Sequence, residues 1–175
     1  YPYAMLTTSG CFDANGKEIT TKAVSLSKNF ANWWDGDLYR ELLDGTHIDK
    51  WNYNAKRVDR LLTGSNVHSN NSTKATPSLS ADILGDWREE VIWPTSDNKA
   101  LRIYTTNYET NHRLYTLMHD IQYREAIAWQ NVGYNQPPHP SYYIGEDMKT
   151  PQKPNIYKCG TYNEKSISSK SDNNN

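Results

Sequence analysis

Short segments of mixed hydrophobic and polar residues, separated by turn-forming residues, follow one another through the middle of the chain. The segment from Leu38 to Leu43 leads through Asp44-Gly45, a pair that favours a hairpin turn, into the segment from His47 to Asn52. A further segment of this kind runs from Arg57 to Thr63. Helical periodicity is weak throughout, so we expect short antiparallel strands.

The same order of elements occurs a second time. Strands are predicted over residues 87–93, 100–106 and 112–118, with a turn at Ser96-Asp97-Asn98 and a polar link from Asn107 to Asn111. A third unit is expected to begin with a strand at Ile127 to Asn131 and to break at Pro137-Pro138.

An internal repeat relates these units. Gly36-Asp37-Leu38-Tyr39-Arg40-Glu41 aligns with Gly85-Asp86-Trp87-Arg88-Glu89-Glu90, sharing the glycine, the aspartate and the final glutamate, and Gly133 follows at nearly the same interval. A period of roughly 50 residues is typical of propeller blades, which bury their faces against neighbouring blades. The alternative is a chance echo, which the matching strand spacing disfavours. The predicted fold class is all-β, a partial β-propeller of two to three blades.

Two or three blades do not close the ring of about four to eight blades that a propeller needs. We therefore expect open sheet edges and partly uncovered blade faces. The segment from Glu164 to Asn175 is rich in Ser, Lys and Asn and poor in apolar residues, which is typical of disorder. The predicted organisation is blades over residues 1–160 and a disordered tail or linker over residues 161–175.

The aromatic composition favours amphipathic rings. The chain of 175 residues contains 13 Tyr and 6 Trp but only 2 Phe, and hydrophobic residues make up 36%, below the usual share. Aromatic rings that carry a polar group suit strands with one solvent-exposed face and surfaces that contact sugars. The alternative is that they fill the interfaces between blades.

Charge and hydropathy exclude two classes of partner. The formal net charge is −1 without a basic stripe, which argues against nucleic acid, and no apolar run is long enough to span a bilayer. Tyr1-Pro2-Tyr3 is not a natural start, so we expect a fragment or an excerpt of a mature region. Cys11 and Cys159 lie near opposite ends of the chain, and both two thiols and one long-range disulfide remain open.

Two acidic turns are candidate calcium loops. Calcium prefers about six to eight oxygen ligands, supplied from alternate positions of a loop. In the second unit this spacing is met by Asp82, Asp86 and Glu90, and in the first unit by Asp35, Asp37 and Glu41. Each loop lacks one acidic ligand, for which water or a carbonyl can substitute. The alternative is that these carboxylates only cap turns and pair with Arg40 or Arg88.

A polar loop from Ser69 to Pro77 precedes the second acidic turn and contains Lys74. Such loops carry binding residues on a rigid β-scaffold. We expect Lys74 and the carboxylates to lie at one rim, as a site for an anionic, hydroxyl-rich ligand. Tyr134 lies one repeat beyond the second acidic turn and is expected on that rim too.

Several motifs, in the correct order, resemble rhamnogalacturonan lyases of polysaccharide lyase family 11. They are residues 33–45, 70–77, 85–93, 101–106, 115–120 and 128–139, and the match extends to about residue 157. The family's members are secreted, calcium-containing, eight-bladed β-propellers of several hundred residues. The resemblance implies that this chain is the last third of such an extracellular protein and that N-terminal blades are its missing partner.

The resemblance implies β-elimination at galacturonate in the acidic polysaccharide rhamnogalacturonan I, a component of pectin. The reaction removes the C5 proton and expels the C4 substituent, and the negative carboxylate makes that proton weakly acidic. A cation must therefore stabilise the developing enolate. Lys74 is expected in this role, or as the base if its amine is neutral. The fragment alone is expected to be inactive, and the alternative function is a non-catalytic carbohydrate-binding or structural segment.

The remaining site residues follow from the same resemblance. The family's Asn-Gly-Thr-Lys loop and a tyrosine are associated with substrate binding, and they match Asn71, Ser72, Thr73, Lys74 and Tyr134. Ser72 stands where glycine is expected, which changes how closely a ligand approaches the backbone. The phenol of Tyr134 is expected to contact the sugar or to protonate the leaving oxygen. Among the five histidines, which lack metal-ligand spacing, His139 is a substrate-binding candidate because it is near Tyr134 in sequence.

Overall fold

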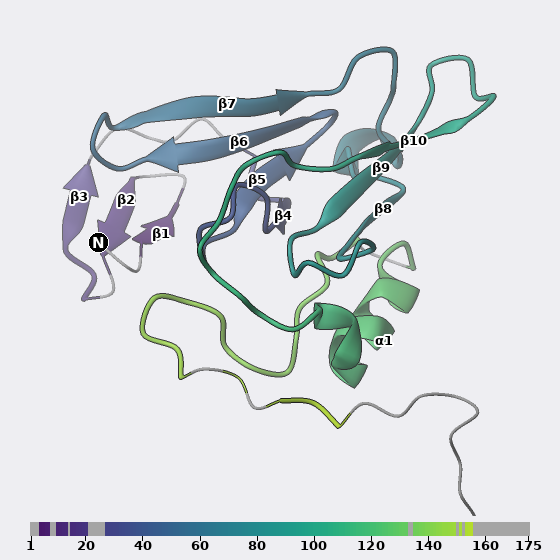
Figure 1. Cartoon of the computed structure of the whole chain (residues 1–175). Helices are drawn as coiled ribbons and strands as arrows, with labels where there is room; N and C mark the ends of the chain where they lie inside the picture. The colour runs from purple at the N-terminus through teal and green to yellow at the C-terminus, as the bar shows by residue number, and fades with distance from the viewer. Residues whose placement is uncertain are drawn as a thin grey trace, which may run out of the picture.

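The computed structural model describes residues 4–7, 10–13, 15–20, 27–132, 135–149, 151 and 153–155. Three antiparallel sheets follow one another along this part of the chain, and the longest helix packs beyond the third sheet (Figure 1). The fold is predominantly β, as the sequence predicts. Within the described residues, no helix has the length and apolar character needed to cross a membrane.

The first sheet lies near the N-terminus and contains β1 (Ala4–Leu6), β2 (Cys11–Asp13) and β3 (Glu18–Thr20). Cys11 and Trp51 form a small buried cluster that joins this sheet to the second one. Cys159 lies outside the described residues, so the choice between two thiols and a disulfide stays open.

The second sheet has four strands paired in chain order: β4 (Phe30–Asn32), β5 (Glu41–Asp44), β6 (His47–Asn52) and β7 (Arg57–Thr63). The predicted strands over residues 47–52 and 57–63 are confirmed with their bounds. The hairpin turn between β5 and β6 contains Gly45 at φ 56°, a left-handed conformation that glycine adopts without a steric penalty. The strand predicted from Leu38 begins later, at Glu41, because residues 33–40 form a loop.

The third sheet contains β8 (Leu79–Ala81), β9 (Glu90–Pro94) and β10 (Leu101–Tyr104), in the order β10-β9-β8. Its first two strands reproduce the internal repeat, because β8 follows β4, and β9 follows β5, at the same interval that separates Gly85 from Gly36. The loop between β8 and β9 therefore corresponds to the loop between β4 and β5. The strands β7 and β10 are outer strands of their sheets, and Leu101 and Ile103 on β10 are 65% and 58% exposed.

Two predicted strands are wrong. Residues 112–118 form no strand and end in the short 3-10 helix η2 (Leu117–His119), and the strand predicted at 127–131 lies at the end of helix α1 (Ile121–Trp129). Asp120 starts this helix, because its side chain accepts a hydrogen bond from the backbone N–H of Tyr123 at 2.8 Å. The first turns of this helix contain Gln122 and Arg124, which have high helix propensity. No third blade therefore begins at Ile127.

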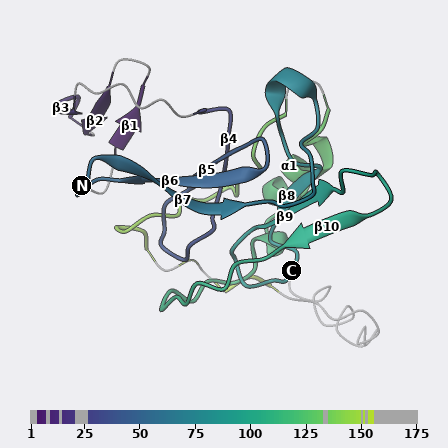
Figure 2. The same ribbon diagram turned by 90° about the horizontal axis from the view of Figure 1, so that it is seen from above.

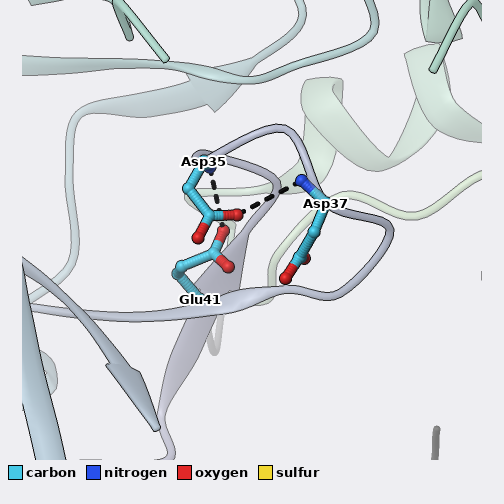
Figure 3. A group of neighbouring side chains, drawn as sticks. All are labelled: Asp35, Asp37 and Glu41. Carbon is cyan, nitrogen blue, oxygen red and sulfur yellow. Dashed lines mark hydrogen bonds between the residues drawn. The ribbon is translucent and has the colours of Figure 1, made fainter. Parts of the chain in front are cut away.

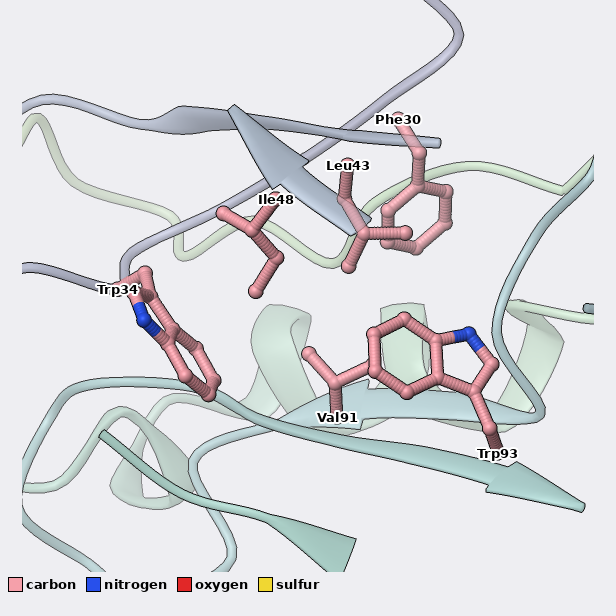
Figure 4. Close-up of a cluster of buried hydrophobic side chains, with 6 residues drawn as sticks. All are labelled: Phe30, Trp34, Leu43, Ile48, Val91 and Trp93. Atoms are coloured by element: carbon pink, nitrogen blue, oxygen red, sulfur yellow. The ribbon is translucent and has the colours of Figure 1, made fainter. Parts of the chain in front are cut away.

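The main core lies between the second and third sheets. Phe30, Leu43 and Ile48 project from one side onto Val91 and Trp93 on the other, with Trp34 closing one flank (Figure 4). Each such side chain stabilises the fold by about 1.5–3 kcal/mol on burial. The three sheets succeed one another across the molecule in chain order (Figure 2).

A second buried cluster joins the loops that precede β5 and β9 to the helical segment. Its members are Trp33, Leu38, Trp87, Leu117, Tyr123 and Ile144. Residues 112–118, for which a strand is predicted, contribute Leu117 to this core without pairing to a strand.

Removal of a side chain from the main core should destabilise the fold far more than the same change on the open edge. Leu43→Ala leaves a cavity between two sheets and should lower the free energy of unfolding of the 175-residue chain by about 2–5 kcal/mol. The matched variant Leu101→Ala removes the same atoms from an exposed position and should change it by less than about 0.5 kcal/mol. Urea unfolding measures both, and equal losses would contradict the assignment of the core.

Candidate functional site

The loop that carries Lys74 is closed by its own backbone. Asn70 and Thr76 exchange hydrogen bonds at 2.8 and 3.2 Å, and the short 3-10 helix η1 (Ser72–Lys74) lies between them. The loop residues 71–73 are exposed and Lys74 is half-buried. Short polar groups and one cationic side chain are thus presented to solvent on a constrained turn.

Contacts with the second sheet fix the place of this loop, which we call the Lys74 loop (residues 70–76). The backbone N–H of Gly45, in the turn after β5, donates to the carbonyl of Ala75 at 2.8 Å. The side chain of Asn29, just before β4, donates to the carbonyl of Lys74. The Lys74 loop therefore lies beside the start of β4 and the end of β5.

The first acidic loop brings its three carboxylates together. Oxygen atoms of Asp35, Asp37 and Glu41 lie within 4.8 Å of one another (Figure 3). Glu41 is buried, and it accepts a hydrogen bond from the backbone N–H of Trp34 at 2.8 Å. Burial, assisted by the charge of Asp35 and opposed by Lys50, raises the pKa of Glu41 to about 8.

A lysine from the neighbouring strand lies against the same carboxylates. Lys50 Nζ, on β6, contacts Asp35 and Asp37 closely and lies 3.4 Å from Glu41 Oε1. Burial would lower the pKa of Lys50, but the hydrogen bonds to Asp35 and Asp37 outweigh this effect and raise it. Sequence reasoning missed Lys50, although the register of a hairpin turning at Asp44-Gly45 places it opposite Glu41.

The second acidic loop does not form an equivalent cluster. Asp82 accepts hydrogen bonds from the Thr116 hydroxyl at 2.6 Å and from the Leu117 backbone at 2.7 Å. Glu90 accepts from two backbone N–H groups within the loop, and Asp86 pairs with Arg88. In the described part of the chain, the first loop is the one acidic group spaced for a metal. Calcium binding by Asp82, Asp86 and Glu90 stays a prediction.

The Lys74 loop and the acidic loops do not lie at one rim, so the prediction that they share one is wrong. The acidic loops follow β4 and β8, whereas the Lys74 loop lies at the start of these strands. Glu41 and Asp44 are the two ends of β5, which at about 3.3 Å per residue lie about 10 Å apart. The motifs are adjacent in sequence, but β8 separates them in space.

The two acidic loops contact each other through Trp33 and Glu89, whereas the expected proximity of Asp37 to Asp86 stays a prediction. Glu89 Oε2 accepts from the backbone N–H of Trp33 at 2.9 Å, and the Glu89 N–H donates to the Trp33 carbonyl at 2.8 Å. The Tyr123 hydroxyl donates to Glu89 Oε1 at 2.6 Å. Burial is the main cause of the raised pKa of Glu89, and the charge of Arg40 opposes it.

The remaining candidates have different outcomes. Tyr134 lies outside the described residues. Its neighbour Asn135 reaches the Lys74 loop, because Asn71 Nδ2 donates to Asn135 Oδ1 at 2.9 Å. His139 is exposed and lines a hollow along α1 together with Gln122 and Trp129, so it is placed with the helix.

Comparison with known proteins gives a consistent result. The family described as rhamnogalacturonan lyase family 11, C-terminal domain, matches residues 2–154. The chain is 56% identical over 150 residues to rhamnogalacturonan endolyase YesW of Bacillus subtilis (strain 168), covering 82% of this chain and 24% of the relative. It is 53% identical over 160 residues to rhamnogalacturonan exolyase YesX of the same strain, covering 87% and 26%.

Solved structures agree with the sequence matches. The crystal structure of YesW superposes with a TM-score of 0.78 at 56% identity, covering 85% of this chain and 25% of that one. A rhamnogalacturonan lyase of Bacillus licheniformis superposes with a TM-score of 0.79 at 60% identity, covering 86% and 26%. The chain spans about a quarter of the length of the curated relatives it matches, which is less than the third that the resemblance implied.

Glu89 should make stability fall with increasing pH. Because burial raises its pKa in the folded state above the ordinary 4.5, its stabilising contribution is present below that value and is lost as pH rises through the folded pKa. The limiting slope is about 1.4 kcal/mol per pH unit for one proton. Glu89→Gln should flatten the dependence of the unfolding free energy on pH, measured by urea unfolding in calcium-free buffer. Glu125 is exposed, so Glu125→Gln should leave this pH dependence unchanged. An unchanged pH dependence in Glu89→Gln would contradict the raised pKa of Glu89.

Proposed function

The chain belongs to rhamnogalacturonan lyase family 11, and from this membership we propose that the protein containing it cleaves the rhamnogalacturonan I backbone of pectin by β-elimination at galacturonate. The observation that carries the proposal is the Lys74 loop, which presents a cationic side chain and short polar groups on a closed, anchored turn. An anionic sugar needs both kinds of group. The relatives named as an endolyase and an exolyase support the same reaction class.

In this proposal Lys74 acts on the galacturonate carboxylate. When a base removes the C5 proton, negative charge develops on the carboxylate, the C4–O bond breaks and a C4–C5 double bond forms. The ammonium group of Lys74 stabilises the developing charge. Asn71, Ser72 and Thr73 hold hydroxyl groups of the sugar, and Tyr134 donates the proton that the leaving oxygen takes up. The base is supplied by the part of the protein that this chain does not contain.

We also propose that the sheets are blades of a propeller. Three observations support this: each sheet is antiparallel, the third sheet repeats the second at the interval from Gly36 to Gly85, and buried clusters join successive sheets. Further blades from the N-terminal part of the protein would complete the ring and the substrate cleft, so the fragment alone is inactive. A polymeric substrate does not cross a membrane intact, so we propose an extracellular location. Residues 161–175 are proposed as a tail or linker.

Calcium is proposed for the first acidic loop. Three carboxylates within 4.8 Å are a donor set that suits a hard cation, and the ammonium of Lys50 is the stand-in cation among them. A bound calcium ion would neutralise Asp35, Asp37 and Glu41 and displace Lys50. Because this loop lies at the opposite end of β5 from the Lys74 loop, the role of the ion is structural.

Loss of Lys74 should lower turnover in the full-length protein. Lys74→Ala should reduce kcat/KM on rhamnogalacturonan I by about 10²–10³-fold, the usual effect of removing one electrostatic stabiliser. Turnover is followed by the absorbance of the unsaturated uronate product, with the exposed Lys17→Ala as the matched control. Unchanged turnover in Lys74→Ala would favour a binding or structural segment, and no product from the wild-type protein would refute the proposed reaction.

Calcium should raise the unfolding temperature. At about 100 times the Kd, a ligand that binds only the folded state adds about 2.7 kcal/mol of stability. Lys50→Met removes the competing ammonium and should increase the calcium response, whereas Asp35→Asn should reduce it. Thermal unfolding with calcium and with a chelator measures these shifts. A wild-type melting curve indifferent to both additions would exclude the metal.

A further inference from the structure

The Lys74 loop has an unusual backbone. Asn71, Ser72 and Ala75 have φ values of 59°, 45° and 49°, in the left-handed region that residues other than glycine rarely adopt. Such conformations persist only where the surroundings fix them, and they cluster at functional sites. The backbone bonds between Asn70 and Thr76 close the loop but leave its exposed tip to be fixed by other groups.

A buried group of polar side chains supplies these contacts. Asn135 is 3% exposed, and its Nδ2 donates to Thr76 Oγ1 at 2.8 Å and to Asn131 Oδ1. Its Oδ1 accepts from Asn71 Nδ2, which also donates to Thr76 Oγ1 at 3.1 Å. Both N–H groups and the carbonyl of Asn135 are therefore used. Thr76 is fully buried, and its hydroxyl is an acceptor for both amides.

This group connects the loop to a rigid element. Asn131, just after α1, donates to the carbonyl of Ser78. The preceding residue, Gln130, is 1% exposed and exchanges two hydrogen bonds of 2.8 Å with the backbone of Ser80 on β8. The end of α1 is thereby pinned to the strand that follows the Lys74 loop.

We propose that Asn135, acting with Thr76, is a positioning residue that holds the Lys74 loop in its left-handed conformation. The inference rests on the proposed function of that loop in binding and stabilising the substrate. In this role Asn135 does not contact the sugar. It restricts the conformations of Asn71 and thereby fixes the position of Lys74. A displacement of about 1 Å in such a group reduces turnover by about 10²-fold.

The test uses the full-length protein and three variants. Asn135→Ala and Thr76→Val remove the amide and the hydroxyl respectively, and Thr76→Ser retains the hydroxyl. The first two should lower kcat/KM on rhamnogalacturonan I by about 10–100-fold, with an increase in KM as well as a loss of kcat, because the loop also binds substrate. Thr76→Ser should retain most of the activity. Asn107→Ala, an exposed asparagine on a distant link, is the matched control.

Proteolysis gives a second readout that needs no activity. Trypsin cleavage between Lys74 and Ala75, identified by mass spectrometry, tracks the population of the open loop. Asn135→Ala and Thr76→Val should increase this cleavage at least about tenfold relative to cleavage after Lys50 in β6, an inner strand of the second sheet whose cleavage requires opening of that sheet. Thr76→Ser and Asn107→Ala should not.

The outcomes separate the two claims. Lyase activity that is unchanged in Asn135→Ala and Thr76→Val would overturn the positioning role and leave the proposed function standing. A wild-type protein without lyase activity would refute the proposed function, while cleavage at Lys74 would still decide whether Asn135 holds the loop. An equal rise in cleavage after Lys74 and after Lys50 would mean that Asn135 stabilises the whole fold, and this would overturn the inference.

Discussion

The packing of the second sheet on the third is the interaction on which the other features depend. A sheet must bury its hydrophobic face against another element, and here Leu43 and Ile48 on one sheet are covered by Val91 and Trp93 on the other. The shared core fixes the orientation of both sheets. It therefore also fixes where the connecting loops emerge, and so which side chains meet at each end of the strands.

Strand positions could be predicted where local signals agree with the tertiary environment. The hairpin turn at Asp44-Gly45 sets the register, and β6 and β7 follow it. Residues 112–118 resemble a strand, but a strand needs a partner, and Leu117 instead packs into the second cluster beside Tyr123. The helix after Asp120 was missed because its apolar stripe is short, with Tyr123 and Ala126 as its buried residues.

The site could be predicted in its residue types more than in its arrangement. The gathering of Asp35, Asp37 and Glu41 follows from a short loop before β5 and was within reach of sequence reasoning. The placement of the Lys74 loop was not, because the short strand β8 carries the chain from one end of the sheet to the other. Asn135 is far from Thr76 in sequence, and contacts over such separations leave no local pattern.

The length of β5 has an evolutionary consequence. This short strand separates the acidic cluster from the turn that supports the Lys74 loop, so the two ends of the sheets share a core but few side chains. Substitutions that change the loops at one end of the strands therefore do not require further substitutions at the other end. A lineage built on this scaffold is consequently free to diversify the loops at the Lys74 end while selection for stability acts separately on the opposite end.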